Sequence, residues 1–202
     1  CAGYLSSLGS VRAHLDDMPL TERIANAQQN DVRCPDPQAA TDMLALIQQT
    51  IEQGETLGGV IEAVMTGIPT GLGSHVHWDR RLDARIGAAI LGIQAIKGIE
   101  IGPAFENTTR WGTQVQDPIL LQDDHLTRSG NRCGGLEGGV TNGEPLIVRA
   151  AMKPIATTLK TQNSVDLATS KTVPIEYERS DFTPVIRAIG VVEAMLSFVL
   201  AD

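Results

Sequence analysis

Lys153 is the residue of this sequence best placed to bind an anion. It directly follows the apolar run 146–152 and directly precedes a proline, so its ammonium group is held at the end of a predicted strand. Thr157 and Thr158 lie a few residues further on and can donate further hydrogen bonds. A fixed cation beside two hydroxyl donors indicates a site for a phosphate or a carboxylate.

Arg179 and Asp181 form a second pair of chemically capable residues. They follow the run 173–178, which we predict to be a strand, and their two-residue spacing puts both side chains on one face. An arginine can bind a carboxylate or phosphate through two hydrogen bonds, and the neighbouring aspartate can accept a proton. An isolated R-x-D is more often an internal ion pair, so both interpretations stay open at this point.

A glycine-rich stretch covers residues 128–143, R-S-G-N-R-C-G-G-L-E-G-G-V-T-N-G. Its two Gly-Gly pairs and the following Asn-Gly allow positive φ and let the backbone approach a flat or phosphorylated ligand without an intervening Cβ. The alternative is a plain connecting loop. Neither G-x-x-x-x-G-K-[ST] nor a G-x-G-x-x-G fingerprint is present, so the glycines indicate neither a P-loop nor a Rossmann site.

Several other residues with reactive side chains are better explained by packing or solvent exposure than by catalysis or metal binding. His75 and His77 alternate along a short segment but lack a third metal ligand. Cys133 stands inside the glycine-rich stretch, where a small packed residue is a simpler explanation than a nucleophile. Asp123 and Asp124 could hold a divalent cation but are typical of a solvated loop. We therefore predict no metal site.

The composition is that of a folded globular protein. The 202 residues are 42% hydrophobic, enough for a substantial core. A net charge of −8 argues against nucleic acid or an anionic membrane as the main partner, because binding to phosphate backbones depends on an excess of Lys and Arg. The 3 cysteines have no CxxC spacing, and no apolar run reaches the roughly 20 residues of a membrane span, which predicts a cytoplasmic protein.

Alternating strands and helices are predicted to position these residues. Strands are expected at 1–9, 57–66, 97–101, 146–152 and 173–178 from their β-branched and apolar content. Helices with apolar residues at helical spacing are expected at 19–29, from Asp36-Pro37 to Gly54, from 80 toward 95, and at 186–200. Residues 103–131 are predicted to be a polar, irregular surface excursion.

A series of ordered motifs makes the sequence resemble the chorismate synthase family. Residues 67–73 (G-I-P-T-G-L-G) are similar to its G-V-P-x-G-L-G turn, and residues 81–84 (R-L-D-A) to its K/R-L-D-A. Residues 92–102 are similar to x-I-x-A-V-K-G-V-E-I-G, and residues 131–143 to N-x-A-G-G-x-x-G-G-x-[ST]-N/S-G. The family motifs K-P-T-S-[ST] and R-[HS]-D correspond to residues 153–157 and 179–181.

The resemblance implies an α/β fold of the α+β type, a β-α-β sandwich in which antiparallel sheets enclose helices, incomplete here. It also implies a cytoplasmic homotetramer that converts 5-enolpyruvylshikimate 3-phosphate into chorismate and phosphate by a 1,4-anti elimination, in the shikimate pathway of aromatic amino-acid biosynthesis. The reaction requires reduced FMN (FMNH2) although it has no net redox change, and the resemblance also implies an association with NADP, while the source of the reduced flavin stays open.

The site residues of the family carry over motif by motif. Asp181 would manage the proton on N5 of the flavin, and Arg179 would contact both the flavin and the anionic substrate. The flavin contacts implied by the matching motifs are Gln94, Ala95, Gly138, Lys153, Pro154, Ile155, Ala156, Thr157 and Arg179.

The chain also departs from the family pattern. Family members carry an N-terminal half with G-E-S-H-G and R-[AS]-S-[AS]-R-E-T, and neither segment occurs here. We therefore expect residues 1–202 to be the C-terminal part of a single catalytic domain that is inactive alone. The alternatives are a non-enzymatic module that binds flavin or another anion, and a purely structural fragment. Within the matched part, Gly130, Cys133 and residues 182–184 are unusual for the family.

Overall fold

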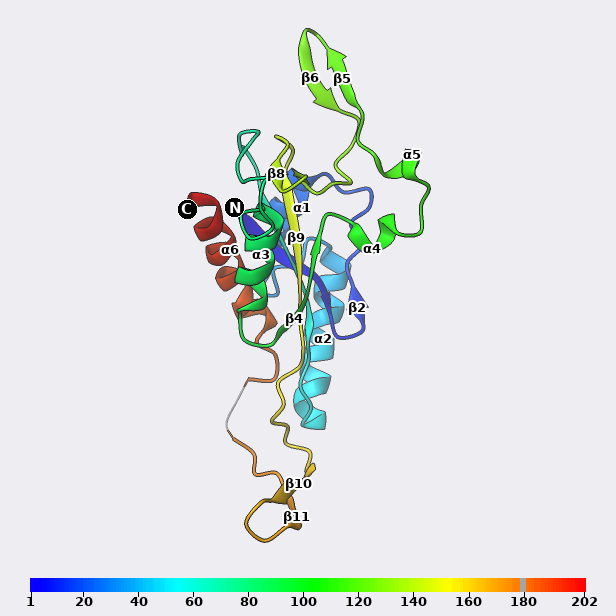
Figure 1. Cartoon of the computed structure of the whole chain (residues 1–202). Coiled ribbons are helices and arrows are strands. Elements are labelled where there is room, and N and C mark those ends of the chain that lie inside the picture. Colours follow the sequence, from blue (N-terminus) through cyan, green and yellow to red (C-terminus); the bar gives the residue numbers. More distant parts are fainter. Residues whose placement is uncertain (179–180) are drawn as a thin grey trace. The chain divides into compact units, whose positions relative to one another are not determined.

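Strands and helices alternate along the chain (Figure 1). A computed structural model describes residues 1–178 and 181–202, with the side chain of His125 set aside. The described residues group into two compact units. Unit 1 comprises Cys1–Gly3, Ile61–Ala151 and Ile189–Asp202, and unit 2 comprises Tyr4–Val60 and Met152–Ala188.

Unit 1 holds the glycine-rich stretch and most of the strands. Its elements in chain order are β3 (Gly59–Met65) from Ile61 onward, α3 (Leu82–Leu91), β4 (Ile96–Ile101), α4 (Ala104–Asn107), α5 (Gly112–Val115), β5 (Ile119–Gln122), β6 (His125–Arg128), β7 (Leu136–Glu137), β8 (Val140–Thr141), β9 (Leu146–Met152) up to Ala151, and α6 (Val185–Ala201) from Ile189 onward.

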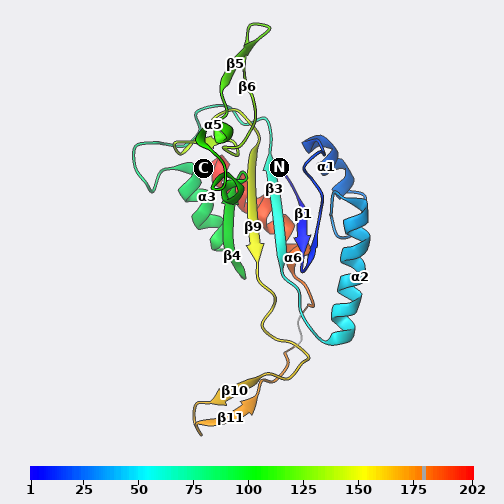
Figure 2. The same cartoon turned by 90° about the vertical axis from the view of Figure 1, so that its right-hand side faces the viewer.

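Unit 2 holds the segment that follows β9. Its elements are β1 (Ala2–Leu8) from Tyr4 onward, β2 (Val11–Arg12), α1 (Leu20–Ala27), α2 (Pro37–Gln53), β10 (Asn163–Asp166) and β11 (Lys171–Pro174). Within this unit α2 lies beside β1 and β2 (Figure 2).

The main sheet has the strand order β2-β1-β3-β9-β4. Burial alternates along β9, where Leu146, Val148 and Ala150 are buried in the core of unit 1. The opposite face of β9 carries Arg149, whose Nε lies 2.6 Å from Oε2 of Glu62 on β3 and whose Nη1 lies 3.3 Å from Oε2 of Glu100 on β4. This ion cluster joins the three neighbouring strands of unit 1.

The long helix α2 begins and ends where its sequence signals predict. Oδ1 of Asp36 accepts hydrogen bonds from the backbone N–H groups of Gln38 (2.9 Å) and Ala39 (3.1 Å), and Pro37 occupies the first helical position, where no N–H is needed. Gly54 ends the helix in the left-handed conformation with φ of 67°. The predicted helix from Asp36-Pro37 to Gly54 is therefore confirmed.

Most other predicted elements are confirmed within a few residues. β1, β3, β4 and β9 match the expected strands, and α1, α3 and α6 match the expected helices, although α3 covers only Leu82–Leu91 of the longer predicted segment. Residues 103–131 are not irregular throughout, because they contain α4, α5 and the hairpin of β5 and β6. The strand expected at 173–178 is also wrong in its extent: β11 ends at Pro174, which has no N–H to continue a ladder.

The fold class predicted for the chain, a mixed α/β fold with antiparallel sheets, is confirmed. The pairs β1 with β2, β5 with β6, β7 with β8 and β10 with β11 are all antiparallel. Among the described residues, no helix is both long and apolar enough to cross a membrane.

Candidate functional site

The glycine-rich stretch 128–143 is tied by its backbone to the loop 69–73 of the same unit. The backbone N–H of Thr141 donates to the carbonyl of Leu72 (2.9 Å), and the N–H of Gly71 donates to the carbonyl of Thr141 (2.8 Å). The Thr141 hydroxyl donates to the carbonyl of Pro69 (2.6 Å) and accepts from the N–H of Leu72 (2.9 Å). Thr141 is only 1% exposed, so this hydroxyl replaces water for two backbone groups.

Most glycines of the stretch are required for packing of backbone against backbone. A Cβ on Gly134 would lie 2.3 Å from the backbone nitrogen of Gly102, and a Cβ on Gly135 would lie 2.7 Å from Cα of Leu146. A Cβ on Gly139 would lie 2.7 Å from the carbonyl oxygen of Ser74. These glycines serve close contacts inside the protein, a reason for glycine that involves no ligand.

Gly138 is different. Its φ is +60°, and a Cβ at this position would meet no atom within 4 Å. Within the fully described stretch 128–143 it is the one glycine that faces open space. It is therefore the glycine of this stretch that a ligand could approach closely, which agrees with its predicted role as a flavin contact and leaves that role a prediction.

Gly138 and the pair Gln94-Ala95 lie at opposite ends of α3. The carbonyl of Gly139 accepts a hydrogen bond from the N–H of Leu82 (2.9 Å), the first residue of the helix, whereas Gln94 and Ala95 follow its last turn. A helix of this length spans about 15 Å. A ligand that contacts both positions has to extend along α3.

Ala95 is held in an unfavourable backbone conformation. Its φ is 67°, in the left-handed region that a residue with a Cβ adopts only at a cost of about 1–2 kcal/mol. Gln94 beside it is exposed, and β4 begins at the next residue, Ile96. Within the sheet, a Cβ on Gly98 of β4 would lie 3.5 Å from Cβ of Ala151, so the start of β4 and the end of β9 meet at one edge.

The segment 153–157 is supported by residues 56–58 of unit 2. The Thr56 hydroxyl donates to the carbonyl of Ile155 (2.7 Å). A Cβ on Gly58 would lie 2.4 Å from the carbonyl oxygen of Met152 and 2.9 Å from the nitrogen of Pro154, so only glycine lets the segment pass here. Lys153 is exposed and makes no hydrogen bond or ion pair with the described residues, so its ammonium is available to an anion.

Of the pair Arg179 and Asp181, only Asp181 belongs to the described residues. Its Oδ2 accepts a hydrogen bond from Nη1 of Arg187 in the first turns of α6, at 2.5 Å. The side chains of Arg187 and Asp181 are 78% and 44% exposed, so this is a solvent-screened pair. The prediction for Arg179 lies outside the described residues.

The predicted flavin residues therefore fall into two groups. Gln94, Ala95 and Gly138 belong to unit 1, and Lys153, Pro154, Ile155, Ala156, Thr157 and Asp181 belong to unit 2. Sequence patterns did not single out Thr56, Gly58 or Arg187, which contact the second group. Gly58 stands in a Gly-Gly pair, which was the one available sign of a close backbone approach.

Among the described residues, the other reactive side chains singled out from the sequence, those of Cys133, His75 and His77, form no second catalytic or metal centre. Burial, and next a hydrogen bond to the Asp117 carboxylate, raise the pKa of Cys133 to about 11, which leaves it a thiol near neutral pH. His75 and His77 are exposed in a bend. No cluster of three or more His, Cys, Asp or Glu in the described part of the chain could hold a metal ion.

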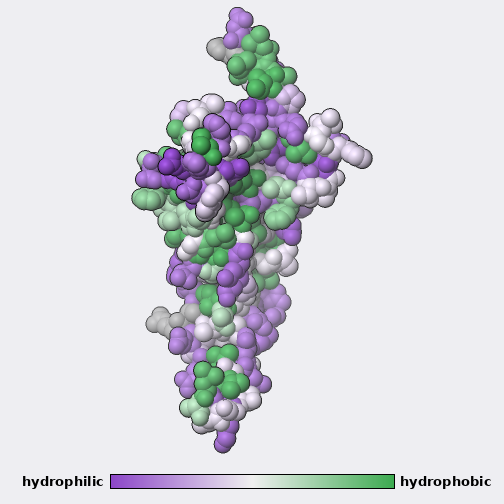
Figure 3. Space-filling model, viewed as in Figure 1, coloured by the Kyte–Doolittle hydropathy of each residue, from purple (hydrophilic) through white to green (hydrophobic). Residues whose placement is uncertain are grey.

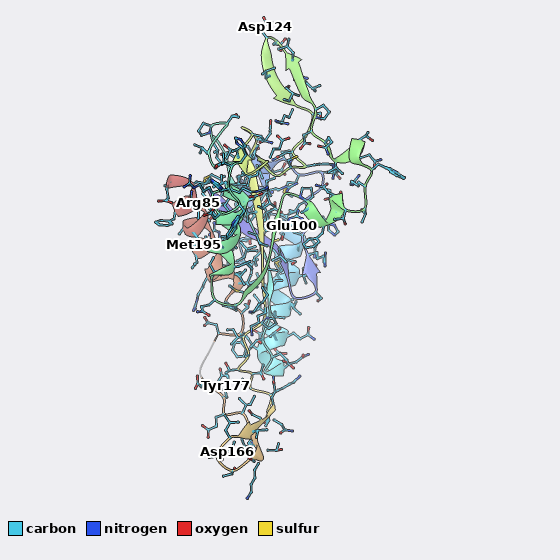
Figure 4. All side chains as sticks on the ribbon, viewed as in Figure 1. Arg85, Glu100, Asp124, Asp166, Tyr177 and Met195 are labelled. Carbon is cyan, nitrogen blue, oxygen red and sulfur yellow. The ribbon has the colours of Figure 1, made fainter. Side chains whose placement is uncertain are left out.

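Figure 4 labels Arg85, which lines a hollow of about 590 Å³ in unit 1. This hollow lies between the loop 72–80 and the last residues of α6, where Arg85 pairs with Asp202. None of the predicted flavin residues lines it. The hollow and the residues singled out from the sequence are thus separate features.

Comparison with known proteins decides the family. A family model described as chorismate synthase matches residues 1–202. The chain belongs to the chorismate synthase family. The chorismate synthase of Thermobifida fusca (strain YX) is 46% identical over 200 residues, which are 98% of this chain and 51% of that protein. The chorismate synthase of Trichlorobacter lovleyi is 47% identical over 208 residues, 99% of this chain and 53% of that protein.

A solved structure agrees with these relatives. The crystal structure of a chorismate synthase superposes with a TM-score of 0.82 and 38% sequence identity, covering 100% of this chain and 55% of that chain. The chain spans about half the length of the curated chorismate synthases it matches.

Proposed function

We propose that this chain is part of an FMNH2-dependent lyase that converts 5-enolpyruvylshikimate 3-phosphate into chorismate and phosphate. The reaction is a 1,4-anti elimination, in which the substrate loses a proton and its phosphate group. The observation that carries the proposal is the match of the chorismate synthase model to all of residues 1–202. The open position of Gly138 and the ammonium of Lys153, which pairs with none of the described residues, support it.

The residues present fit a flavin mononucleotide. Gly138 offers a backbone without a Cβ to a flat ring, and Lys153 offers a cation to a phosphate. Thr157 is half-buried on the same segment as Lys153, while Gln94 is exposed two residues before β4 begins. Reduced FMN, when bound, supplies a transient source of electrons to a reaction with no net redox change.

The charged residues of the chain would handle the anionic groups and the proton. Lys153 and Arg179 would balance the phosphate and carboxylates of the substrate, so that cations are concentrated locally in a chain of net charge −8. Asp181, with a half-exposed carboxylate, would hold or move the proton at N5 of the flavin.

We further propose that the chain is the C-terminal part of one catalytic domain, acting in a cytoplasmic homotetramer. The family model matches the chain without interruption, which favours one domain although the described residues pack as two units. The chain alone would bind flavin without completing the reaction, because the family motifs G-E-S-H-G and R-[AS]-S-[AS]-R-E-T are not in its sequence.

Fluorescence titration of the chain with FMN tests the proposal. We expect the chain to bind FMN, and Lys153→Ala to weaken binding at least tenfold through loss of a charged hydrogen bond of about 1.5–3 kcal/mol. Lys160→Ala is the matched control on the same segment, since Lys160 pairs with Glu55 instead (2.7 Å), and should leave the affinity within about twofold.

Equal weakening by both variants, or no FMN binding at all, would contradict the flavin assignment. Turnover of 5-enolpyruvylshikimate 3-phosphate separates the enzyme from a non-enzymatic flavin-binding module. A chorismate synthase that includes this chain as its C-terminal part should release chorismate and phosphate with reduced FMN, whereas a binding module should not.

A further inference from the structure

The connection between β9 and α6, residues 153–184, has no hydrophobic core of its own. None of its described residues is buried. Figure 3 shows hydrophobic residues on the surface near the bottom of the view, where β10 and β11 lie, and Leu167 of this hairpin is 92% exposed. A segment with few buried apolar contacts opens at a low cost in free energy. The placement of the β9–α6 connection therefore depends on what holds its two ends.

Loop 54–58 (G-E-T-L-G), which joins α2 to β3, holds the first end through hydrogen bonds. The Thr56 hydroxyl donates to the Ile155 carbonyl (2.7 Å). The Gly54 carbonyl accepts from the N–H of Leu159 (3.0 Å). Each bond joins the loop to backbone or side-chain groups of unit 2 that no apolar core fixes in place.

The same loop fixes the backbone on both sides of Lys153. A Cβ on Gly58 would lie 2.4 Å from the carbonyl oxygen of Met152 and 2.9 Å from the nitrogen of Pro154, the two neighbours of Lys153 in the chain. Glycine permits this close approach because it has no side chain. The loop therefore determines where the backbone of Lys153 lies.

The second end of the connection is held by the next residue of the same loop. The N–H of Leu57 donates to the carbonyl of Phe182 (2.8 Å), and Phe182 directly follows Asp181. Because Thr56 and Leu57 are consecutive, standard covalent dimensions place the carbonyl oxygens of Ile155 and Phe182 no more than about 10 Å apart. The two ends of the connection are thus close enough for one ligand to contact both.

We propose that Thr56 is a positioning residue of the flavin site, and that loop 54–58 fixes the spacing between the segments that carry Lys153 and Asp181. The inference rests on the proposed function, because only that function makes Lys153 and Asp181 parts of one site. Thr56 acts through the backbone of these segments and not by contact with the flavin. A misplacement of such groups by about 1 Å is enough to weaken binding and catalysis strongly.

Fluorescence titration with FMN tests the role of the Thr56 hydroxyl. Thr56→Val should raise the dissociation constant about tenfold, as expected for the loss of one hydrogen bond, whereas Thr56→Ser keeps the hydroxyl and should stay within about twofold of the wild type. Thr50→Val is the matched control. It removes a hydroxyl that donates to the Leu46 carbonyl (2.7 Å) within α2 of the same unit, and should also stay within about twofold.

A double-mutant cycle shows whether Thr56 acts through the segment of Lys153. In a Lys153→Ala background, Thr56→Val should raise the dissociation constant by less than about threefold, because effects of coupled residues do not add. A tenfold loss in both backgrounds would mean that Thr56 only stabilises the protein, and overturns the proposal. So does a Thr56→Ser variant that binds FMN as weakly as Thr56→Val.

Amide hydrogen exchange without flavin, measured by NMR, gives an independent readout. Thr56→Val should accelerate exchange of the Leu57 amide, which bonds to Phe182, together with that of the Leu159 amide, which bonds to Gly54. Thr50→Val should accelerate neither. Acceleration of only one of the two amides overturns the proposal whether or not FMN binds, whereas a wild-type chain that binds no FMN contradicts the proposed function alone.

Discussion

Two regions whose residue types indicate a ligand site, the glycine-rich stretch 128–143 and the segment 153–160, are built differently. The glycine-rich stretch 128–143 is fastened along its backbone to the loop 69–73, with the buried Thr141 between them. The segment 153–160 is mostly exposed and is held beside the end of α2, where the Gly54 carbonyl accepts hydrogen bonds from the N–H groups of Leu159 (3.0 Å) and Lys160 (3.3 Å). The first region is a scaffold, whereas the second leaves the Lys153 ammonium without a partner among the described residues.

The difference shows that a high density of glycines does not by itself indicate a ligand-binding site. A glycine is needed wherever a Cβ would collide, and the colliding atom can belong to a ligand or to the protein. At Gly134 the colliding atom is the backbone of Gly102, whereas at Gly138 nothing is there. The neighbourhood of each glycine decides between the two roles.

Replacing Gly134 and Gly138 by alanine should give the largest effect of the experiments that compare the two roles of glycine. Gly134→Ala should destabilise the protein by more than about 3 kcal/mol, because the backbone of Gly102 cannot retreat and the residue is also left-handed, with φ of +64°. Gly138→Ala has a similar φ of +60° but no collision, so it should cost only the left-handed strain of about 1–2 kcal/mol. Urea unfolding of both variants measures the difference.

The Gly138→Ala variant also has a second use. If Gly138 is a flavin contact, the variant should weaken FMN binding more than its modest loss of stability can explain. Similar free energies of unfolding for the two alanine variants would show that the packing of Gly134 against Gly102 is not what its close approach indicates.

A matched pair of threonines gives the next largest effect. Thr141→Val removes one buried hydroxyl and leaves the Leu72 N–H and the Pro69 carbonyl without partners, which should cost about 2–3 kcal/mol. Thr158→Val removes a hydroxyl that donates to the Lys160 carbonyl (2.9 Å) in the open segment, where water can replace it, and should cost less than about 0.5 kcal/mol. Thermal unfolding followed by circular dichroism compares the two, and equal shifts in Tm would remove the distinction between scaffold and open segment.

Local sequence signals predicted the parts of the fold that depend on neighbours in the chain. The caps at Asp36 and Gly54 fix α2, and the apolar run of β9 needs no distant information. The pairing of Thr141 with residues 69–72 could not be predicted this way, because its partners lie about seventy positions away and no short pattern names them.

The β5–β6 hairpin was missed for a different physical reason. Residues 119–121 are Ile-Leu-Leu, which does not alternate between apolar and polar as a half-buried strand does. The turn is Asp123-Asp124, whereas the strong hairpin signals are Asn-Gly and Asp-Gly. Both departures belong to a hairpin whose Ile119, Leu121 and Leu126 side chains are 61%, 69% and 77% exposed.

The hydrogen bond that supports the segment 153–160 can be tested with a substitution that should have a smaller effect on stability. Thr56→Val removes the hydrogen bond to the Ile155 carbonyl (2.7 Å) and should cost about 1 kcal/mol. Amide hydrogen exchange should accelerate in residues 153–160 and stay unchanged in 128–143, because the two regions have separate supports. Thr41→Val, which removes a bond to the Pro37 carbonyl within α2 (3.1 Å), is the control and should leave exchange in 153–160 unaltered. Faster exchange in both regions would mean that Thr56 acts on the whole protein.

The smallest expected effect is that of Arg187, which pairs with Asp181, and Arg128 at the start of the glycine-rich stretch is its comparison. Arg187 pairs with Asp181 while 78% exposed, so Arg187→Ala should change the free energy of unfolding by less than about 0.5 kcal/mol, and the change should vanish at high salt. Arg128 is 16% exposed, lies 2.7 Å from Oε2 of Glu137 and donates to the Asp117 carbonyl at 3.0 Å. Arg128→Ala should therefore cost about 1–3 kcal/mol, with little dependence on salt, because it leaves a carbonyl and a carboxylate with reduced hydrogen bonding. Urea unfolding at low and high salt distinguishes the two arginines: a salt-independent loss for Arg187→Ala would place Asp181 in a fixed ion pair, and a carboxylate so occupied would be poorly suited to moving a proton at a flavin.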